Sequence, residues 1–196
     1  MTPELARAAL KKYFGYDDFR PLQLNIVERT YRGEDAIVLM PTGGGKSMCF
    51  QIPAVTMNGT VIVVSPLISL MKDQVDGLNA VGIRAAFLNS SQSGTDSHQV
   101  ENAYENGELH LLYVSPEKLL SAGFFSFLKR RNVCLFAIDE AHCISDWGHD
   151  FRPDYRRIVR ILKARPKTLP VLATTATAND RVVSDIKNQL GQHILI

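Results

Sequence analysis

The stretch Val38-Leu-Met-Pro-Thr-Gly-Gly-Gly-Lys-Ser47 decides the fold of this chain. It begins inside an apolar run, residues 36–40, which predicts a buried strand. Pro41 ends that run, three glycines follow, and the residues after Ser47 can begin a helix. Glycines allow backbone N–H groups to point at one anion, and the helix dipole favours negative charge at the first turn. The stretch therefore predicts a phosphate-binding loop between a strand and a helix.

The loop follows most of the pattern Gly-x-x-x-x-Gly-Lys-Ser/Thr, in which the lysine contacts the β- and γ-phosphates and the hydroxyl binds Mg²⁺. Met40 stands at the first glycine position, whereas Gly43 to Ser47 fit. These roles are therefore expected for Lys46 and Ser47. The alternative is a glycine-rich turn that carries a lysine by chance.

A second motif follows the apolar run Val133–Ile138, another predicted buried strand. Asp139 can hold Mg²⁺ through the water shell of the ion, and Glu140 can orient or deprotonate the water that attacks the γ-phosphate. With Lys46, these carboxylates form the predicted catalytic set. The alternative is an acidic helix start after a strand, where Asp and Glu are common.

Predicted strands and helices alternate along the whole chain. Helices are expected over residues 3–12, from Pro21 to Gly33, from the turn at residues 66–69 to about residue 81, and over 95–106 and 179–190, with a short one from Pro116 and a basic one after residue 152. Further strands are expected over 60–65, 84–88, 109–114, 171–174 and 193–196. The alternation predicts an α/β fold with a doubly wound, mostly parallel sheet and helices on both faces. Ligands of such sheets bind at the carboxyl ends of the strands, where both motifs fall. The 196 residues suit one domain with a helical lead-in over about residues 1–33.

Composition and charge limit the classes of protein to which this chain can belong. The net charge is only +2, but residues 152–167 hold seven basic residues and one acidic residue. That excess can line phosphates or can be a solvated helix face. Three scattered cysteines suit a reducing compartment, and no secretory signal precedes the first helix. We expect a cytoplasmic protein (near the nucleoid in a bacterium) without a membrane partner, because no run approaches the ~18 apolar residues of a membrane helix. Nothing implies an obligate oligomer.

Asp139-Glu-Ala-His142 resembles the DEAH box of superfamily-two helicases, and the surrounding chain resembles the RecQ family of DNA helicases more closely. The matching segments are Phe14-Gly-Tyr16, Phe19-Arg-Pro21 with Gln23, Met40–Ser47, Val64–Gln74, Asp139–Tyr155 and Thr175-Ala-Thr177. Met40 is no defect within this family. Thr174 stands where the family usually has leucine, which affects the packing beneath Thr175.

The resemblance implies the first RecA-like motor domain of an enzyme that uses Mg·ATP to move 3′ to 5′ on single-stranded DNA. Such an enzyme unwinds duplex DNA in repair and recombination. Tyr16 would stack on adenine, Gln23 would hydrogen-bond its N6/N7 edge, and Arg20 would support them. The implied ATP site comprises Tyr16, Arg20, Gln23, Met40, Pro41, Thr42, Gly43, Gly44, Gly45, Lys46 and Ser47, with Mg²⁺ on Ser47 and Asp139. A packed aromatic at a helix junction is the alternative for Tyr16.

The resemblance also implies DNA contacts and a link between the two sites. His142 would hydrogen-bond to Thr175 or Thr177 and couple the nucleotide to DNA. The DNA-binding residues would be Trp147, His149, Phe151 and Arg152, with weaker candidates Ser65, Ser69 and Lys72. Exposed aromatic residues beside cations suit stacking on single-stranded bases. The alternative is that Trp147 and Phe151 are core anchors.

The chain ends soon after Thr177, so we expect it to be a fragment that lacks a second RecA-like domain and the zinc-binding and winged-helix regions. Loss of the arginine finger that a second domain supplies lowers the hydrolysis rate by ~10³–10⁵. Nucleotide binding by the fragment is expected to be weak as well. Two other classes remain possible: a stand-alone ATPase or nucleotide kinase with a phosphate loop, and an inactive binding module.

Overall fold

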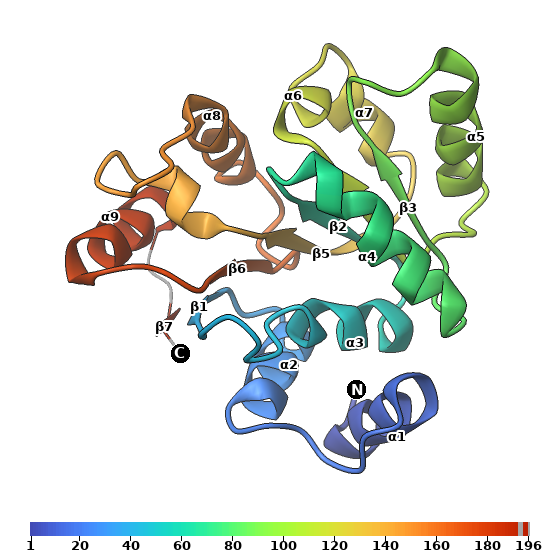
Figure 1. Cartoon of the computed structure of the whole chain (residues 1–196), viewed down its shortest axis with the longest axis horizontal. Coiled ribbons are helices and arrows are strands. Elements are labelled where there is room, and N and C mark those ends of the chain that lie inside the picture. Colours follow the sequence, from blue (N-terminus) through green and yellow to red (C-terminus); the bar gives the residue numbers. More distant parts are fainter. Residues whose placement is uncertain (192–193, 196) are drawn as a thin grey trace.

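The structure is a computed structural model that describes residues 1–191 and the backbone of residues 194–195. A sheet of seven parallel strands runs through the described part in the order β3-β4-β2-β5-β6-β1-β7 (Figure 1). The strands are β1 (Ala36–Leu39), β2 (Thr60–Val64), β3 (Ala85–Leu88), β4 (Leu111–Val114), β5 (Val133–Ile138), β6 (Val171–Thr175) and β7 (Ile194–Leu195).

Helices pack on both faces of this sheet (Figure 1). One face carries α2 (Gln23–Tyr31), α3 (Met48–Thr56) and α4 (Ile68–Ala80), and α1 (Pro3–Phe14) packs outside them against α2 and α3. The other face carries α5 (Gly94–Glu105), α6 (Pro116–Leu119), α7 (Phe124–Leu128), the 3₁₀ helix η1 (Ala141–Ile144), α8 (Pro153–Leu162) and α9 (Asp180–Leu190). None of the helices in the described residues could span a membrane, since each is too short or too polar.

The alternation of side chains along the strands explains why both faces are covered. In β2, Ile62 and Val64 pack on the α5–α9 face, whereas Val61 and Val63 pack on the α2–α4 face. Successive strand residues point to opposite faces, so a continuous β-branched run is buried on both. The predicted doubly wound sheet is confirmed, and the pairings are parallel throughout the described strands.

Some predicted boundaries were wrong. The second helix begins at Gln23 rather than Pro21, because Leu22 has a left-handed φ of 72° and makes a turn with Pro21. The short helices α7 and η1 lie where no helix was predicted, since runs of four or five residues carry almost no periodic signal. Of the expected strand over 193–196, the middle two residues form β7, and His193 and Ile196 lie outside the described residues.

Strand order brings the two sequence motifs together. The glycine loop follows β1, and Asp139 follows β5, with only β6 between these strands. The register pairs Val38 with Thr174 on one side of β6 and Ile138 with Ala173 on the other. The end of β6 therefore lies between the predicted phosphate loop and the predicted metal-binding carboxylate.

Candidate functional site

A cavity of about 410 Å³ lies at the carboxyl edge of the sheet. Its walls come from the connection between α1 and α2, the glycine loop, the start of α4 and the end of β5. The predicted site residues that line it are Tyr16, Arg20, Gln23, Gly43, Gly45, Lys46, Ser47, Asp139 and Glu140. Met40 is buried beneath the loop, and Pro41, Thr42 and Gly44 do not line the cavity.

All three glycines of the loop suit their positions, for two different reasons. Gly43 and Gly45 have left-handed φ angles of 79° and 83°, and a Cβ atom on Gly45 would lie 2.3 Å from Nε2 of Gln23. A Cβ atom on Gly44 would lie 2.8 Å from the Pro41 carbonyl oxygen, which accepts a hydrogen bond from the Gly44 N–H. The turn is therefore too tight for a side chain at Gly44, and a side chain at Gly45 would displace the Gln23 amide.

Gln23 and Arg20 hold this loop from outside. Gln23 is buried, and its Nε2 donates to the Gly45 carbonyl oxygen at 3.0 Å while its Oε1 accepts from the Arg20 N–H at 2.9 Å. The Arg20 guanidinium donates to the Gly43 carbonyl oxygen. Gln23 and Arg20, which are predicted to recognise adenine, thus also hydrogen-bond to the predicted phosphate loop. One amide hydrogen and one lone pair of Gln23 remain for a ligand.

Tyr16 is 56% exposed at the rim of the cavity, so it is not the packed aromatic of the alternative interpretation. More than half of its surface is therefore accessible to a ligand. Leu67 and Leu70, at the start of α4, contribute apolar lining that sequence reasoning did not include. An apolar wall beside polar braces is typical of sites for nucleotide bases and other small ligands.

The donor set in the cavity fits a hydrated magnesium ion. Ser47 is the residue before α3, and its side chain does not cap the helix, so the hydroxyl is available to a ligand. Asp139 supplies a carboxylate to the same cavity. Mg²⁺ prefers one or two carboxylate or hydroxyl oxygens, with water and phosphate completing its shell. Lys46 Nζ lies 3.4 Å from the Met40 carbonyl oxygen, a weak contact that leaves the ammonium free to turn to a phosphate.

Asp139 is buried and tightly held. Its Oδ1 accepts from the Glu140 N–H and from the Thr174 hydroxyl, both at 3.0 Å. Its carbonyl oxygen accepts from the buried Tyr155 hydroxyl at 2.9 Å. Burial, followed by the nearby Glu140 charge, raises the pKa of Asp139, against the opposing effects of these donors and of Lys46. A carboxylate in this state gains from a bound cation. The expectation that Thr174 affects only packing was incomplete, because its hydroxyl bonds to this carboxylate.

Glu140 has a left-handed φ of 54°, which is rare for a residue with a side chain. Its carboxylate Oε2 lies 3.3 Å from Nδ1 of His142, and the same nitrogen lies 3.0 Å from the Thr175 hydroxyl. Both contacts are satisfied by the tautomer in which Nδ1 carries the proton, because a carboxylate only accepts. Burial, followed by the neighbouring His149, lowers the pKa of His142, so the ring is neutral at pH 7.

A chain of polar contacts therefore leads from Glu140 to Thr177. The Thr175 hydroxyl oxygen contacts both the carbonyl oxygen and the N–H of Thr177 at 3.3 Å. The expected hydrogen bond from His142 is present, and it goes to Thr175 rather than directly to Thr177. Adjacent residues of β6 thus serve different partners, since Thr174 contacts Asp139 on one face of the strand and Thr175 contacts His142 on the other.

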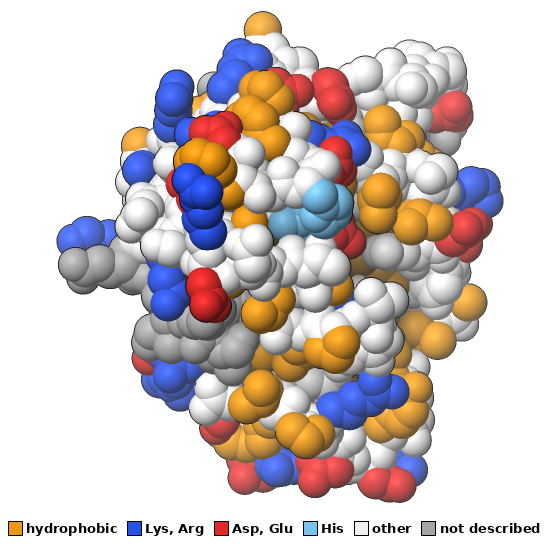
Figure 2. Space-filling model, turned by 60° about the vertical axis from the view of Figure 1, so that its left-hand side comes forward, with side chains coloured by type: hydrophobic (Ala, Val, Ile, Leu, Met, Phe, Trp, Pro, Cys, Tyr) orange, Lys and Arg blue, Asp and Glu red, His pale blue; other side chains and the backbone are white. Residues whose placement is uncertain are grey.

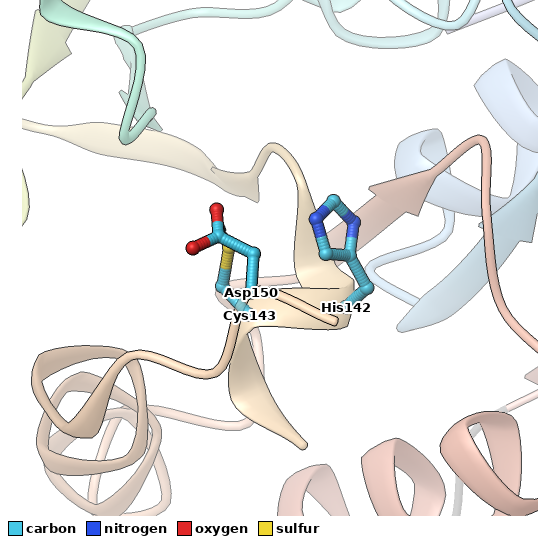
Figure 3. Close-up of side chains that lie close together, drawn as sticks. All are labelled: His142, Cys143 and Asp150. Carbon is cyan, nitrogen blue, oxygen red and sulfur yellow. Dashed lines mark hydrogen bonds between the residues drawn. The ribbon is translucent and has the colours of Figure 1, made fainter. Parts of the chain in front are cut away.

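His142, Cys143 and Asp150 lie together, with one potential ligand atom of each within 4.8 Å of the others (Figure 3). Burial raises the pKa of the Cys143 thiol to about 12, so the sulfur keeps its proton and donates to Asp150 Oδ2 at 3.7 Å. Arg152 donates to the same oxygen at 3.3 Å. The contact between Cys143 and Asp150 therefore ties the loop after η1 back onto η1, while His142 contacts Thr175 and Glu140 instead.

That loop, residues 145–152, carries the predicted DNA-contacting aromatics and is called here the aromatic loop. Trp147 is 54% exposed, so it is not a core anchor, whereas Phe151 is half-buried. The exposed His149 ring stacks on His142 at 4.5 Å between centroids. The aromatic loop thus contacts the same histidine that contacts Glu140 at the cavity.

Sequence reasoning missed the residues that anchor the aromatic loop. Asp185 of α9 accepts from the Ser145 hydroxyl at 2.7 Å and from Arg156 of α8 at 2.9 Å. Arg156 also donates to the Ile144 carbonyl oxygen, and Arg181 of α9 stacks on Trp147. In a sequence, a single charged residue on an amphipathic helix is indistinguishable from one on the solvent-exposed face. No sequence signal therefore predicts the contacts of Asp185, Arg156 and Arg181.

The three weaker candidates for DNA contacts, Ser65, Ser69 and Lys72, differ in how far they are buried. Ser65 is buried and accepts weakly from the Leu67 N–H at 3.4 Å, which suits a role in the turn before α4. Ser69 and Lys72 are exposed on α4, where Lys72 pairs with Asp76. On the face viewed in Figure 2, Lys and Arg side chains are dispersed among hydrophobic, acidic and His side chains, without one large basic patch.

Comparisons with known proteins agree with this geometry. The model of the DEAD/DEAH box helicase family matches residues 20–186. The chain is 51% identical over 95% of its length to the ATP-dependent DNA helicase RecQ of Haemophilus influenzae, and 48% identical over 94% to that of Bacillus subtilis. It covers 30% and 32% of those proteins, so it spans about a third of their length.

Solved structures share the fold. The DNA-bound DUF1998 helicase MrfA matches 98% of this chain and 27% of its own, with a TM-score of 0.75 and 22% identity. A hypothetical ATP-dependent RNA helicase of Sulfolobus tokodaii matches 99% of this chain and 56% of its own, with a TM-score of 0.72 and 18% identity. The family model matches residues 20–186, and the glycine loop lines the same cavity as the carboxylates of Asp139 and Glu140. The chain therefore belongs to the DEAD/DEAH box helicase family.

Proposed function

We propose that this chain is the ATP-binding motor domain of a RecQ-type DNA helicase, which couples hydrolysis of Mg·ATP to 3′–5′ movement on single-stranded DNA and to unwinding of duplex DNA. One observation carries the proposal: Lys46, Ser47, Asp139 and Glu140 come from two distant segments and line one cavity. The similarity to RecQ helicases supports the choice of DNA as the polymer.

The residues of the cavity have separate roles in this proposal. The Lys46 ammonium binds the β- and γ-phosphates, and the backbone N–H groups of the glycine loop bind their oxygens. Ser47 and Asp139 would hold a magnesium ion, which would neutralise charge on the phosphates. Glu140 orients the attacking water and accepts its proton. These are positioning and electrostatic roles, which dominate phosphoryl transfer.

Recognition of the base rests on the α1–α2 connection. Tyr16 is exposed at the rim for stacking, and Gln23 has a donor and an acceptor left to match the N6/N7 edge of adenine. Because Gln23 and Arg20 also hold the carbonyl groups of the glycine loop, binding of the base would stabilise the loop that holds the phosphates.

Coupling to DNA rests on contacts between Glu140 and the aromatic loop. His142 lies between them, at 3.3 Å from the Glu140 carboxylate and stacked on His149. A base that stacks on Trp147 would shift the aromatic loop, and the His142 ring would transmit that shift to Glu140. Arg152, Ser69 and Lys72 are the proposed phosphate contacts of the DNA strand.

A nucleotide titration tests the proposal. Lys46→Ala should abolish measurable binding of a fluorescent ATP analogue, whereas Lys129→Ala, an exposed lysine outside the cavity, should bind like the parent. Single-stranded DNA should then raise ATP turnover by the whole protein. Equal binding by both variants would refute the assignment of the cavity, and turnover that ignores DNA would favour a stand-alone ATPase.

A further inference from the structure

We propose that Thr174 is a positioning residue for magnesium, because its hydroxyl holds the Asp139 carboxylate in the orientation that presents one oxygen to the ion. The inference rests on the proposed function, in which Asp139 binds the ion. It adds Thr174 of β6 to a proposed magnesium site whose other residues, Ser47 and Asp139, come from the glycine loop and the end of β5.

The contact follows from the register of the sheet. Ala173 pairs with Ile138, so the next residue of β6, Thr174, lies beside Asp139 at the end of β5. The side chain of Thr174 is completely buried, and Oγ1 donates to Asp139 Oδ1 at 3.0 Å. A buried hydroxyl with a partner at this distance is fixed in space.

Two donors meet on one oxygen of Asp139. The Glu140 N–H and the Thr174 hydroxyl both bond to Oδ1, while Oδ2 has no hydrogen bond from any described residue. The pair of donors prevents rotation of the carboxylate about its Cβ–Cγ bond. Oδ2 is thereby left for the water shell of a cation in the cavity that Asp139 lines.

Thr174 acts on the ion only through the orientation of the Asp139 carboxylate, because its hydroxyl donates to Oδ1. Hydrogen-bond partners of metal-binding groups typically change metal affinity by about 10–100-fold when they are removed. Thr174 is therefore expected to affect affinity for the ion more than affinity for the nucleotide.

The test measures the magnesium concentration that gives half-maximal enhancement of binding of a fluorescent ADP analogue. Thr174→Val keeps the volume and removes the hydroxyl, whereas Thr174→Ser keeps the hydroxyl. Thr60→Val is the matched control, because Thr60 is a buried strand threonine of the same sheet whose hydroxyl donates to the Leu109 carbonyl oxygen at 2.9 Å, away from Asp139. Thermal unfolding of each variant checks the fold.

We expect Thr174→Val to require about tenfold more magnesium, and Thr174→Ser and Thr60→Val to stay within about twofold of the parent. Binding of the nucleotide in EDTA should be the same in all four proteins. An unchanged magnesium requirement in Thr174→Val would overturn the inference and leave the proposed function standing. Equal weakening with and without magnesium would overturn it too, since that is a packing effect. A parent protein with no magnesium-dependent nucleotide binding would overturn the proposed function itself.

Discussion

The guanidinium carbon of Arg181 lies 3.2 Å from the centroid of the Trp147 ring, so a side chain of α9 stacks on the aromatic loop. Arginine stacks well on an indole because its cation is planar and weakly hydrated. One face of Trp147 is therefore covered by protein, while 54% of the residue remains exposed. This arrangement keeps part of the ring exposed without leaving it free to rotate.

The first prediction concerns this contact. Arg181→Ala should make the fluorescence of Trp147, the single tryptophan of the chain, more accessible to acrylamide, because the covered face of the ring becomes exposed. Lys187→Ala, on the same helix, is the control and should leave quenching unchanged. Equal quenching of Arg181→Ala and the parent protein would show that the two side chains are not stacked in solution.

The second prediction separates the two sites. Trp147→Ala should leave ATP binding nearly unchanged and abolish stimulation of hydrolysis by single-stranded DNA in the whole protein. The physical reason is that Trp147 does not line the nucleotide cavity, whereas stacking of one base on an aromatic ring contributes ~1–3 kcal/mol. Both quantities are measured on the same preparation. A parallel loss of ATP binding would assign Trp147 a structural role.

The third prediction concerns the anchor of the aromatic loop. Asp185→Ala removes the acceptor shared by Ser145 and Arg156 and should lower the free energy of unfolding by about 1–3 kcal/mol, because partly buried donors lose their partner. Asp146→Ala is a matched control, since Asp146 also pairs with Arg156 at 3.1 Å but its side chain is 50% exposed. Its removal should change stability by less than about 1 kcal/mol. Urea unfolding measures both, and similar losses would contradict the prediction.

The fourth prediction links the Asp139 carboxylate to stability. Burial raises the pKa of Asp139, so between its unfolded and folded pKa values the folded state holds more protons than the unfolded state. Stability is then lost as pH rises through that window. Asp139→Asn carries no charge and keeps an acceptor for Thr174. In EDTA at pH 7 it should be more stable than the parent by on the order of 1 kcal/mol, the size of a typical single-substitution effect.

That gain should shrink as the pH falls through the raised pKa of Asp139, because the parent carboxylate then binds a proton in the folded protein. Urea unfolding at pH 4 and pH 7 measures the difference. A gain of the same size at both pH values would mean that charge on Asp139 is not its source.

The fifth prediction compares two glycines of the phosphate loop. Both have left-handed φ angles, so alanine at either strains the backbone by ~1–2 kcal/mol. Only at Gly45 would the new Cβ atom collide with Gln23, at 2.3 Å, whereas Gly43 has open space around it. Gly45→Ala should therefore lose more nucleotide affinity than Gly43→Ala in a titration with ATP. Equal losses would show that Gln23 does not brace the loop.

Much of the fold followed from local patterns. Buried strands such as Thr60–Val64 are continuous β-branched runs, and the alternation with helices predicts a parallel sheet. Short elements such as η1 were missed because four residues are too few to show a period. The start of α2 was misplaced because proline at residue 21 favours a first helical turn, whereas the left-handed Leu22 delays it.

The sequence by itself determined the chemistry of the proposed nucleotide site. Lys46, Ser47, Asp139 and Glu140 stand next to the strands that carry them, and parallel strands bring their carboxyl ends to one edge of the sheet. Only the tertiary structure decided which side chains brace that chemistry. Thr174 contacts Asp139 because β6 lies between β1 and β5, and Arg181 and Asp185 reach the aromatic loop because α9 packs against η1. These contacts join residues that lie 34 to 40 positions apart in the sequence. Threonine, arginine and aspartate are common on any strand or helix, so their presence does not predict the contacts. Strand order and helix packing bring the residues together.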